Sequence, residues 1–451
     1  MRFTFLFASI ITALLASFAA SIHAAELLAG PMVGATAMRQ VKIWVQGKGV
    51  GTAAVEYWDV TTPKSVLRSK PVKMEDDHDH VAQFTLGLLE PGRRYGYRVM
   101  MNGREQKVPQ SLAFSTQSLW QWRTDAPDWK LAFGTCSYDN EVLYDRPGRG
   151  YGGPPENKRI FDVMAKQQPD LTLWGGDYLY FREVDEDSES GLRYRWRYAR
   201  SIAEQQGLLR TGSHISIWDD HEFGPNDSNS SYSLKGEALT LFKRYWPNAS
   251  FGLPETPGTF GNQRFNDAEI FLLDNRFYRD SDKLQSEDKS MLGAAQVRWL
   301  KNAMLASVAP FKIIVSGSQV TNDVNRFESW TRFPKERADF LKFVADHKID
   351  GVVILSGDRH FTELLKYERA GTYPLYELTC SPLLSGVPSN LDAERANKQI
   401  VPGTFVADRN FCTIDFSGPR NERKITMRSF ANSGEQNWQH EIKLSDLKTP
   451  K

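Results

Sequence analysis

Short, largely apolar runs that each end in a polar cluster recur along the second part of the chain. Six of these runs are predicted to be buried strands, at 130–134, 171–174, 215–218, 269–273, 312–315 and 352–355. Helical patterns at 296–306 and 334–346 alternate with them. Strands that alternate with helices are typical of an α/β domain whose site lies at the carboxyl ends of the strands. Residues 119–451 are therefore predicted to form one such domain.

The preceding part of the chain has a different pattern, in which apolar and polar residues alternate over short segments. These segments lie at 41–45, 53–58, 82–86 and 95–99, with turn residues between them. A period of two at this spacing indicates a small antiparallel sandwich. Residues 88–97 resemble the turn and following strand of fibronectin type III modules, and 114–116 resemble the closing strand. We expect a fibronectin III- or immunoglobulin-like β-sandwich at 25–118.

The first 24 residues have the features of a secretory signal peptide. Arg2 precedes an uncharged apolar run at 3–20, and small residues follow, with cleavage expected near Ala24 or Ala25. A retained membrane anchor is the alternative, because the run approaches spanning length. The small residues favour cleavage, so we expect an exported protein, periplasmic or extracellular, with no stable membrane anchor.

The net charge and the number of cysteines further restrict the classes of function that this chain could have. The signal peptide holds one of the 56 basic residues, so 55 remain against 55 acidic residues, which indicates no surface for nucleic acid. The three cysteines leave at least one thiol without an intramolecular partner. A bridge between Cys380 and Cys412 would leave Cys136 single, but spacing alone does not fix this pairing.

Four of the predicted strands end in side chains that bind metals. Most of these clusters are weak signals alone, and Cys136 by itself indicates a buried structural thiol. The acidic cluster at 219–222 is more informative, because acids at the end of a buried strand are costly unless cations or hydrogen bonds compensate them. Carboxylates can bridge cations, and phenolate suits ferric iron. Because the clusters follow strand ends in order, we predict a multi-metal site formed by Cys136, Asp177, Tyr180, Asp220, Asp358 and His360.

At these residues the chain resembles the alkaline phosphatase D (PhoD-type) family of the calcineurin-like and purple-acid-phosphatase metallophosphoesterases. The resemblance implies a four-layer α/β sandwich for the second domain, and ferric iron with calcium as cofactors. It assigns the first metal to Cys136, Asp177, Tyr180 and His360, and the second to Asp177, Asp220 and Asp358. It also implies that His221 and Glu222 are catalytic. Asn226 and Arg276 are candidates for substrate binding, although Arg276 could instead pair with Asp274.

The expected activity is hydrolysis of phosphate esters, on a small-molecule or lipid phosphoester, by a hydroxide that the cations generate from water. One alternative is a phosphodiesterase, or a phospholipase D-type enzyme, acting on phospholipids or nucleotides. Another is a secreted binding protein without catalysis, which the intact candidate ligands disfavour. Three other segments are predicted to be an exposed turn at 76–80, a solvated acidic face at 185–189, and a loop at 141–158 that is either a surface connection or the mouth of the site.

Overall fold

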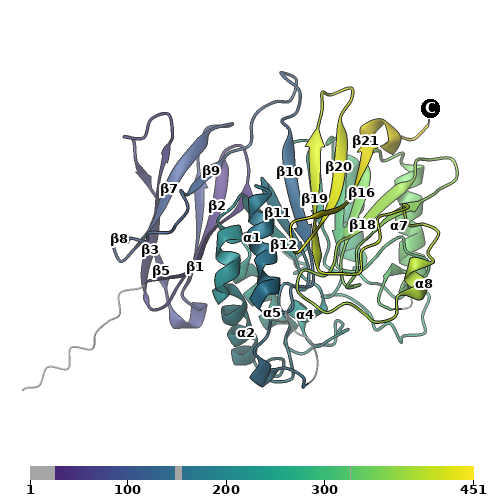
Figure 1. Ribbon diagram of the computed structural model, residues 1–451, viewed down its shortest axis with the longest axis horizontal. Coiled ribbons are helices and arrows are strands. Elements are labelled where there is room, and N and C mark those ends of the chain that lie inside the picture. The colour runs from purple at the N-terminus through teal and green to yellow at the C-terminus, as the bar shows by residue number, and fades with distance from the viewer. Residues whose placement is uncertain (1–25, 148–154, 326, 451) are drawn as a thin grey trace, which may run out of the picture.

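The computed structural model describes residues 26–147, 155–325 and 327–450 (Figure 1). The expected signal peptide at 1–24, and the middle of the predicted loop at 141–158, lie outside these residues. Two large sheets pack face to face in the second domain, and a smaller sheet completes a sandwich at the N-terminal end. The fold class predicted from the sequence is confirmed.

The larger sheet has nine strands and combines a parallel centre with antiparallel edges. Strands β10 (Trp129–Gly134), β11 (Leu171–Gly175) and β12 (Ser213–Ile217) are parallel neighbours, so their carboxyl ends point to the same end of the sheet. The order is β21 (Gln436–Lys443), β20 (Lys424–Ala431), β19 (Asn410–Ser417), β10 (Trp129–Gly134), β11 (Leu171–Gly175), β12 (Ser213–Ile217), β1 (Leu27–Thr36), β2 (Gln40–Gly47) and β6 (Val81–Gly87).

The second large sheet has six strands, and its centre is also parallel. The order is β13 (Gly261–Phe265), β14 (Ala268–Leu272), β15 (Phe311–Ser316), β16 (Val352–Ser356), β18 (Leu375–Thr379) and β17 (Glu363–Tyr367). Leu131 and Ile215 of the nine-stranded sheet share one buried core with Ile313 and Val353 of this sheet. This core holds the two sheets together.

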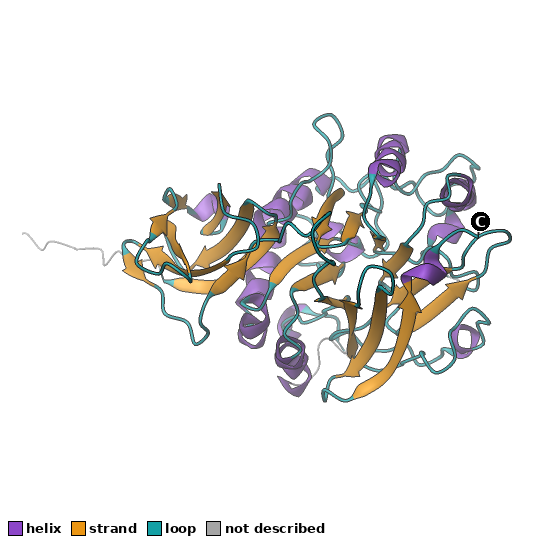
Figure 2. Ribbon diagram, turned by 90° about the horizontal axis from the view of Figure 1, so that it is seen from above, coloured by secondary structure: helices purple, strands orange, loops and turns teal. Residues whose placement is uncertain are grey.

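Helices cover the outer face of each large sheet, so the domain has four layers (Figures 1 and 2). Trp196 of α2 and Phe242 of α5 pack with Trp174 of β11, whereas Leu300 of α6 and Phe340 of α7 belong to the core around the six-stranded sheet. No helix among the described residues combines the length and the apolar character needed to cross a membrane. The helices are α1 (Arg159–Lys166), α2 (Glu189–Ser201), α3 (Gln206–Leu209), α4 (Asp220–Phe223), α5 (Lys235–Tyr245), α6 (Ala294–Ala306), α7 (Pro334–Asp346) and α8 (Asp392–Arg395).

The N-terminal sandwich is joined to the second domain through a strand that the sequence did not predict. Strand β1 pairs with β2 in the sandwich and runs parallel to β12, with Val33 opposite Ser213. The alternation of apolar and polar residues that would predict this strand is interrupted by Gly30, Pro31 and Gly34. At Gly34 a side chain would lie 2.3 Å from Pro247, so glycine permits this close approach. The nine-stranded sheet therefore continues across the predicted domain boundary at residue 118.

The other face of the sandwich is a small sheet that packs on β1, β2 and β6. Its apolar core includes Ile43, Val55, Phe84 and Tyr97. The order is β4 (Leu67–Arg68), β3 (Gly51–Asp59), β7 (Arg94–Met101) and β8 (Arg104–Glu105), with β5 (Val72–Met74) paired to β3 and β9 (Ala113–Ser115) paired to β7.

Two segments that were predicted to be solvated contain buried acids. In the turn at 76–80 the side chain of Asp79 is fully buried, and its carboxylate lies 2.9 Å from Arg193 of α2 and 2.6 Å from Arg244 of α5. In the acidic run at 185–189, Asp185 is buried and lies 2.9 Å from Arg195. The other acids of both runs are exposed or partly exposed, as predicted, and the predictions are corrected only at Asp79 and Asp185, whose carboxylates arginines from the helices compensate.

The cysteine pairing that the sequence left open is now resolved. A disulfide joins Cys380 to Cys412, and Cys136 is a buried free thiol. Cys136 is thus available as a ligand.

The buried ion pairs of Asp79 should account for much of the attachment of the sandwich to the helices. Asp79→Ala leaves two arginines without their partner, so we expect a loss of about 3 to 5 kcal/mol in the free energy of unfolding, measured by urea denaturation. The matched control is Asp77→Ala, because Asp77 is exposed and should give no measurable change. Equal midpoints for the two variants would contradict this role of Asp79.

Candidate metal centre

The candidate ligands lie just beyond the carboxyl ends of four strands, three in the nine-stranded sheet and one in the six-stranded sheet. Cys136 follows β10, Asp177 follows β11 and Asp220 begins α4 after β12, all in the nine-stranded sheet. Asp358 follows β16 in the six-stranded sheet. The carboxyl ends of parallel strands are the usual place for a site in an α/β fold. Both sheets therefore contribute to one cluster.

Four of these residues have an uncommon backbone conformation. Cys136, Asp177, Asp358 and His360 have φ values of 59°, 56°, 68° and 57°, which lie in the left-handed region. Non-glycine residues rarely adopt it, and it persists where the surrounding structure over-determines it. Here Ser137 N donates to the carbonyl of Asp177 at 2.7 Å, which ties two ligand segments together.

A glycine before Asp177 makes room for the cluster. Gly176 has a φ of 102°, and a Cβ atom there would lie 2.8 Å from Cβ of Asp219. Any other residue would therefore be strained in conformation and would also displace the Asp219–Asp220 segment.

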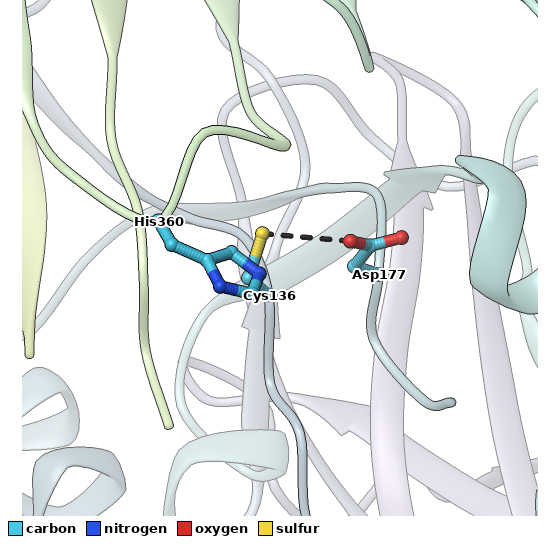
Figure 3. A group of neighbouring side chains, drawn as sticks. All are labelled: Cys136, Asp177 and His360. Atoms are coloured by element: carbon cyan, nitrogen blue, oxygen red, sulfur yellow. Dashed lines mark hydrogen bonds between the residues drawn. The ribbon is translucent and has the colours of Figure 1, made fainter. Parts of the chain in front are cut away.

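One group of ligand atoms combines sulfur, nitrogen and oxygen. Atoms of Cys136, Asp177 and His360 all lie within 4.8 Å of one another, and the thiol donates to Asp177 Oδ2 at 3.5 Å (Figure 3). The hydroxyl of Tyr180 donates to the same Oδ2 at 3.1 Å and lies 3.3 Å from Nε2 of His360. Ser385 lies 3.0 Å from this hydroxyl. The predicted ligands of the first metal are thus brought together.

A second group of ligand atoms adjoins the first and is mainly carboxylate. Asp177, Asp220 and His221 offer atoms within 4.8 Å of one another, and so do Asp220, Asp227 and Glu328. Asp177 belongs to both the first and the second group, as a bridging ligand would. Asp358, in contrast, offers no atom to these groups of described residues, so the structure leaves its predicted role as a prediction.

Asp227 and Glu328 are not among the site residues predicted from the sequence. Asp227 lies in the loop after α4 rather than at a strand end, and its backbone N donates to Asp220 Oδ2 at 2.9 Å. The only sequence signal was its position beside Asn226.

Unpaired buried oxygens show that this donor set suits cations. Oδ1 of Asp177, Oδ1 of Asp220 and Oδ2 of Asp358 are buried without a hydrogen-bond partner among the described residues. A buried carboxylate without compensation is costly. Sulfur, imidazole and phenol favour a transition metal, whereas carboxylate oxygens favour a hard cation. The residues therefore fit the two kinds of metal that the family resemblance implies.

Burial and like charges shift the protonation of the cluster. Burial, followed by the charge of Asp220, raises the pKa of Asp177 well above its usual value. Burial and the charge of Asp177 likewise raise the pKa of the Cys136 thiol. Burial lowers the pKa of His360 to about 4, so its imidazole is neutral near pH 7 and can act as a ligand. Cation binding requires the acids to deprotonate, so it must overcome their raised pKa values.

Glu222 lies behind the cluster rather than in it. Its side chain is fully buried, and the carboxylate accepts hydrogen bonds from the backbone N of Asp177 at 2.8 Å and of Asp219 at 3.1 Å, and also from Tyr178. These hydrogen bonds fix the turn that presents Asp177, which is a positioning role; the catalytic role predicted for Glu222 stays a prediction.

Arg276 also lies behind the cluster, although the sequence suggested contact with substrate. Its guanidinium is fully buried, 2.6 Å from Asp219 and 2.5 Å from Glu328. Of the groups of Arg276, only the backbone N donates a hydrogen bond to the carboxylate of Asp274, at 3.0 Å. Arg276 also lies 3.6 Å from Asp220, so it compensates three buried acids, and it does not line the pocket described next.

A pocket of about 650 Å³ opens over the cluster. Tyr180, His221 and His360 form its floor, and the exposed Asn226 lies on its wall. The wall is completed by Tyr138, Arg146, Arg182 and residues 386–389. Arg146 belongs to the predicted loop at 141–158, so the described part of that loop reaches the mouth of the site. Asn226 is placed where it can contact a substrate.

Comparisons with known proteins bear on this arrangement. A family model described as PhoD-like phosphatase matches residues 149–421, and a domain of unknown function (DUF7800) matches residues 24–119. Alkaline phosphatase D of Bacillus subtilis (strain 168) is 24% identical over 373 residues, in a match that covers 70% of this chain. The match covers 60% of that relative's own length.

Two solved structures share the fold. A structure of PhoD superposes with a TM-score of 0.72 at 18% identity, covering 91% of this chain and 88% of the other. A purple acid phosphatase from yellow lupin (Lupinus luteus) seeds gives a TM-score of 0.65 at 11% identity, covering 92% and 75%. The arrangement of layers is thus common to proteins of low sequence identity.

Removing the metals should destabilise the protein, because the buried carboxylates lose their counter-charges. At free metal 100-fold above its Kd, we expect the metal-loaded protein to exceed the chelator-treated protein by about 2.7 kcal/mol, measured by thermal unfolding. Asp177→Asn should reduce this difference, while Asp77→Asn, in an exposed acidic group, should preserve it. A difference that Asp177→Asn leaves unchanged would place the metal elsewhere.

Glu222→Gln tests the positioning role. Glutamine can accept with only one oxygen, so at least one backbone N–H near Asp177 loses its partner, at about 1 to 3 kcal/mol of stability. We expect lower stability and lower metal content by elemental analysis. A variant with wild-type stability and metal content that has lost turnover would instead support the catalytic role.

Proposed function

This chain belongs to the PhoD-like phosphatase family, and from that premise we propose that it hydrolyses phosphate esters as an alkaline phosphatase does. The observation that carries the proposal is the convergence of a thiol, a phenol, an imidazole and unpaired carboxylates beneath one pocket. A site of this composition suits hydrolysis that depends on metal ions.

We assign ferric iron to Cys136, Asp177, Tyr180 and His360, and calcium to Asp177, Asp220 and Asp358. When bound, the cations lower the pKa of water and neutralise charge on the phosphoryl oxygens. Elemental analysis of protein purified without added metal, with a visible spectrum to detect a thiolate or phenolate charge-transfer band, tests the assignment.

His221 is the residue that we place nearest to the leaving group. Its ring packs against the ring of Tyr180 in a tilted arrangement with centroids 3.9 Å apart, and its Nδ1 is buried without a hydrogen-bond partner among the described residues. Burial, followed by the charge of Arg182, lowers the pKa of His221. The imidazole is held against the floor of the pocket, where it positions the substrate; the other role, donating a proton to the leaving alkoxide, needs the protonated imidazole, which the lowered pKa disfavours.

A second candidate activity is hydrolysis of phosphodiesters such as phospholipids or nucleotides. The pocket volume favours it, because about 650 Å³ exceeds the space that one phosphoryl group needs. Assays with p-nitrophenyl phosphate and bis(p-nitrophenyl) phosphate separate the two activities. Absence of turnover with both esters, in protein that contains bound metal, would leave a binding protein without catalysis.

Export is also part of the proposal. It rests on the signal-like sequence at 1–24 and on the disulfide between Cys380 and Cys412, since disulfides persist in oxidising compartments. The test is the N-terminal sequence of protein recovered from the periplasm or medium, which should begin near residue 25.

His221→Ala should lower kcat for p-nitrophenyl phosphate by about 100-fold or more, because it removes a positioned imidazole. Metal content should be retained, since all the residues to which we assign the metals are intact. The matched control is His347→Ala, an exposed residue beyond α7, which should retain wild-type kcat. Undiminished turnover of the His221 variant would reject the proposed role.

A further inference from the structure

Arg182 lines the pocket beside the metal centre, and the mechanism above gives it no contact with the substrate. It follows Tyr180 by two residues, and its guanidinium lies over the rings of Tyr138 and Tyr180, at 4.5 and 5.3 Å. Tyr138 and Tyr180 are themselves stacked, with centroids 4.4 Å apart. The guanidinium is thus packed directly against the phenol that we assign as a metal ligand.

All polar atoms of Arg182 except Nη2 take part in hydrogen bonds. Its backbone N donates to Asp185 Oδ2 at 3.1 Å, Nε donates to the Tyr138 hydroxyl at 3.0 Å, and Nη1 donates to the carbonyl of Phe181 at 3.3 Å. Nη2 donates no hydrogen bond to any described residue, yet it is not an enclosed atom. The residue is only 6% exposed, so this open donor lies on a largely buried cation that faces the pocket.

The other arginine of the pocket is arranged differently. Arg146 is 42% exposed at its side chain and is bound to Glu183, with Nε at 2.8 Å and Nη2 at 2.7 Å from the carboxylate. Arg182 has a counter-ion in Asp145, 3.4 Å from Nε, but this contact leaves Nη2 free. Arg182 is therefore the rigid cation of the pocket with a donor available to an anionic ligand.

We propose that Arg182 binds a non-bridging oxygen of the substrate phosphoryl group and thereby selects phosphomonoesters over phosphodiesters. The inference rests on the proposed function and names the substrate class of the same site. A monoester offers three non-bridging oxygens and carries up to two negative charges. A diester offers two such oxygens and one charge, and its second ester oxygen is a poor acceptor. The guanidinium of Arg182 would add a third positive group, with a hydrogen-bond donor, beside the two metal ions. It therefore favours the monoester, which has the third non-bridging oxygen and the second negative charge.

The test compares Arg182→Gln with wild type, both with bound metal, on p-nitrophenyl phosphate and bis(p-nitrophenyl) phosphate. We expect kcat/KM for the monoester to fall about 10- to 100-fold, as for the loss of one charge-assisted hydrogen bond. For the diester we expect a fall of less than about threefold. The inhibition constant of inorganic phosphate should rise by the same factor as the monoester loss. Arg182→Lys should restore part of the selectivity, because it keeps the charge.

Asp145→Asn separates substrate binding from a purely structural role. It removes the counter-ion but keeps the guanidinium, so monoester selectivity should persist; a structural role would make it behave like Arg182→Gln. Arg146→Gln, at the outer wall, should change the selectivity less than about threefold. Equal losses for both esters with unchanged phosphate inhibition would overturn the assignment of Arg182. A wild-type enzyme that hydrolyses neither ester would instead overturn the proposed function itself.

Discussion

Several acids are buried close together beyond the carboxyl ends of strands from the two large sheets, and they repel one another. The rest of the structure has to compensate this repulsion. Asp219 and Glu328 are compensated by Arg276, and Glu222 is compensated by backbone amides. Oδ1 of Asp177 and Oδ1 of Asp220 are buried without a hydrogen-bond partner among the described residues, although the guanidinium of Arg276 also lies 3.6 Å from Oδ1 of Asp220. The protein thus compensates Asp219, Glu222 and Glu328 with its own groups, while Asp177 and Asp220 keep carboxylate oxygens that can bind cations.

The N-terminal sandwich contributes to the rigidity of this centre although it supplies none of the assigned ligands. Strand β1 lies beside β12, so the strand that precedes Asp220 has neighbours on both sides, β11 and β1. The buried carboxylate of Asp79 also joins the sandwich to α2 and α5, which cover the same sheet. A movement of the sandwich would therefore disturb the support of the second group of ligands.

Much of this arrangement could be predicted from local patterns, because strand ends and helix limits are local properties. The helix predicted at 334–346 matches α7, and the strand ends carrying Cys136, Asp177 and Asp220 lie where they were expected. Strand β1 was missed because glycine and proline hide its alternation. The burial of Asp79 depends on Arg193 and Arg244, more than 100 residues away, so no local pattern indicates it. Likewise, His221 and Glu222 are neighbours in sequence, but the single turn of α4 directs one to the pocket and the other to the backbone behind Asp177.

The left-handed backbone at Cys136, Asp177, Asp358 and His360 restricts how such a centre can change during evolution. Asparagine, aspartate and glycine tolerate that conformation well, whereas β-branched residues are strongly disfavoured in it. Valine, isoleucine and threonine are therefore poor replacements at these positions, whatever metal is present. A change of metal specificity would have to use one of the few side chains that this backbone conformation accepts at these positions. The backbone therefore limits which metal ions related proteins could evolve to bind at this site.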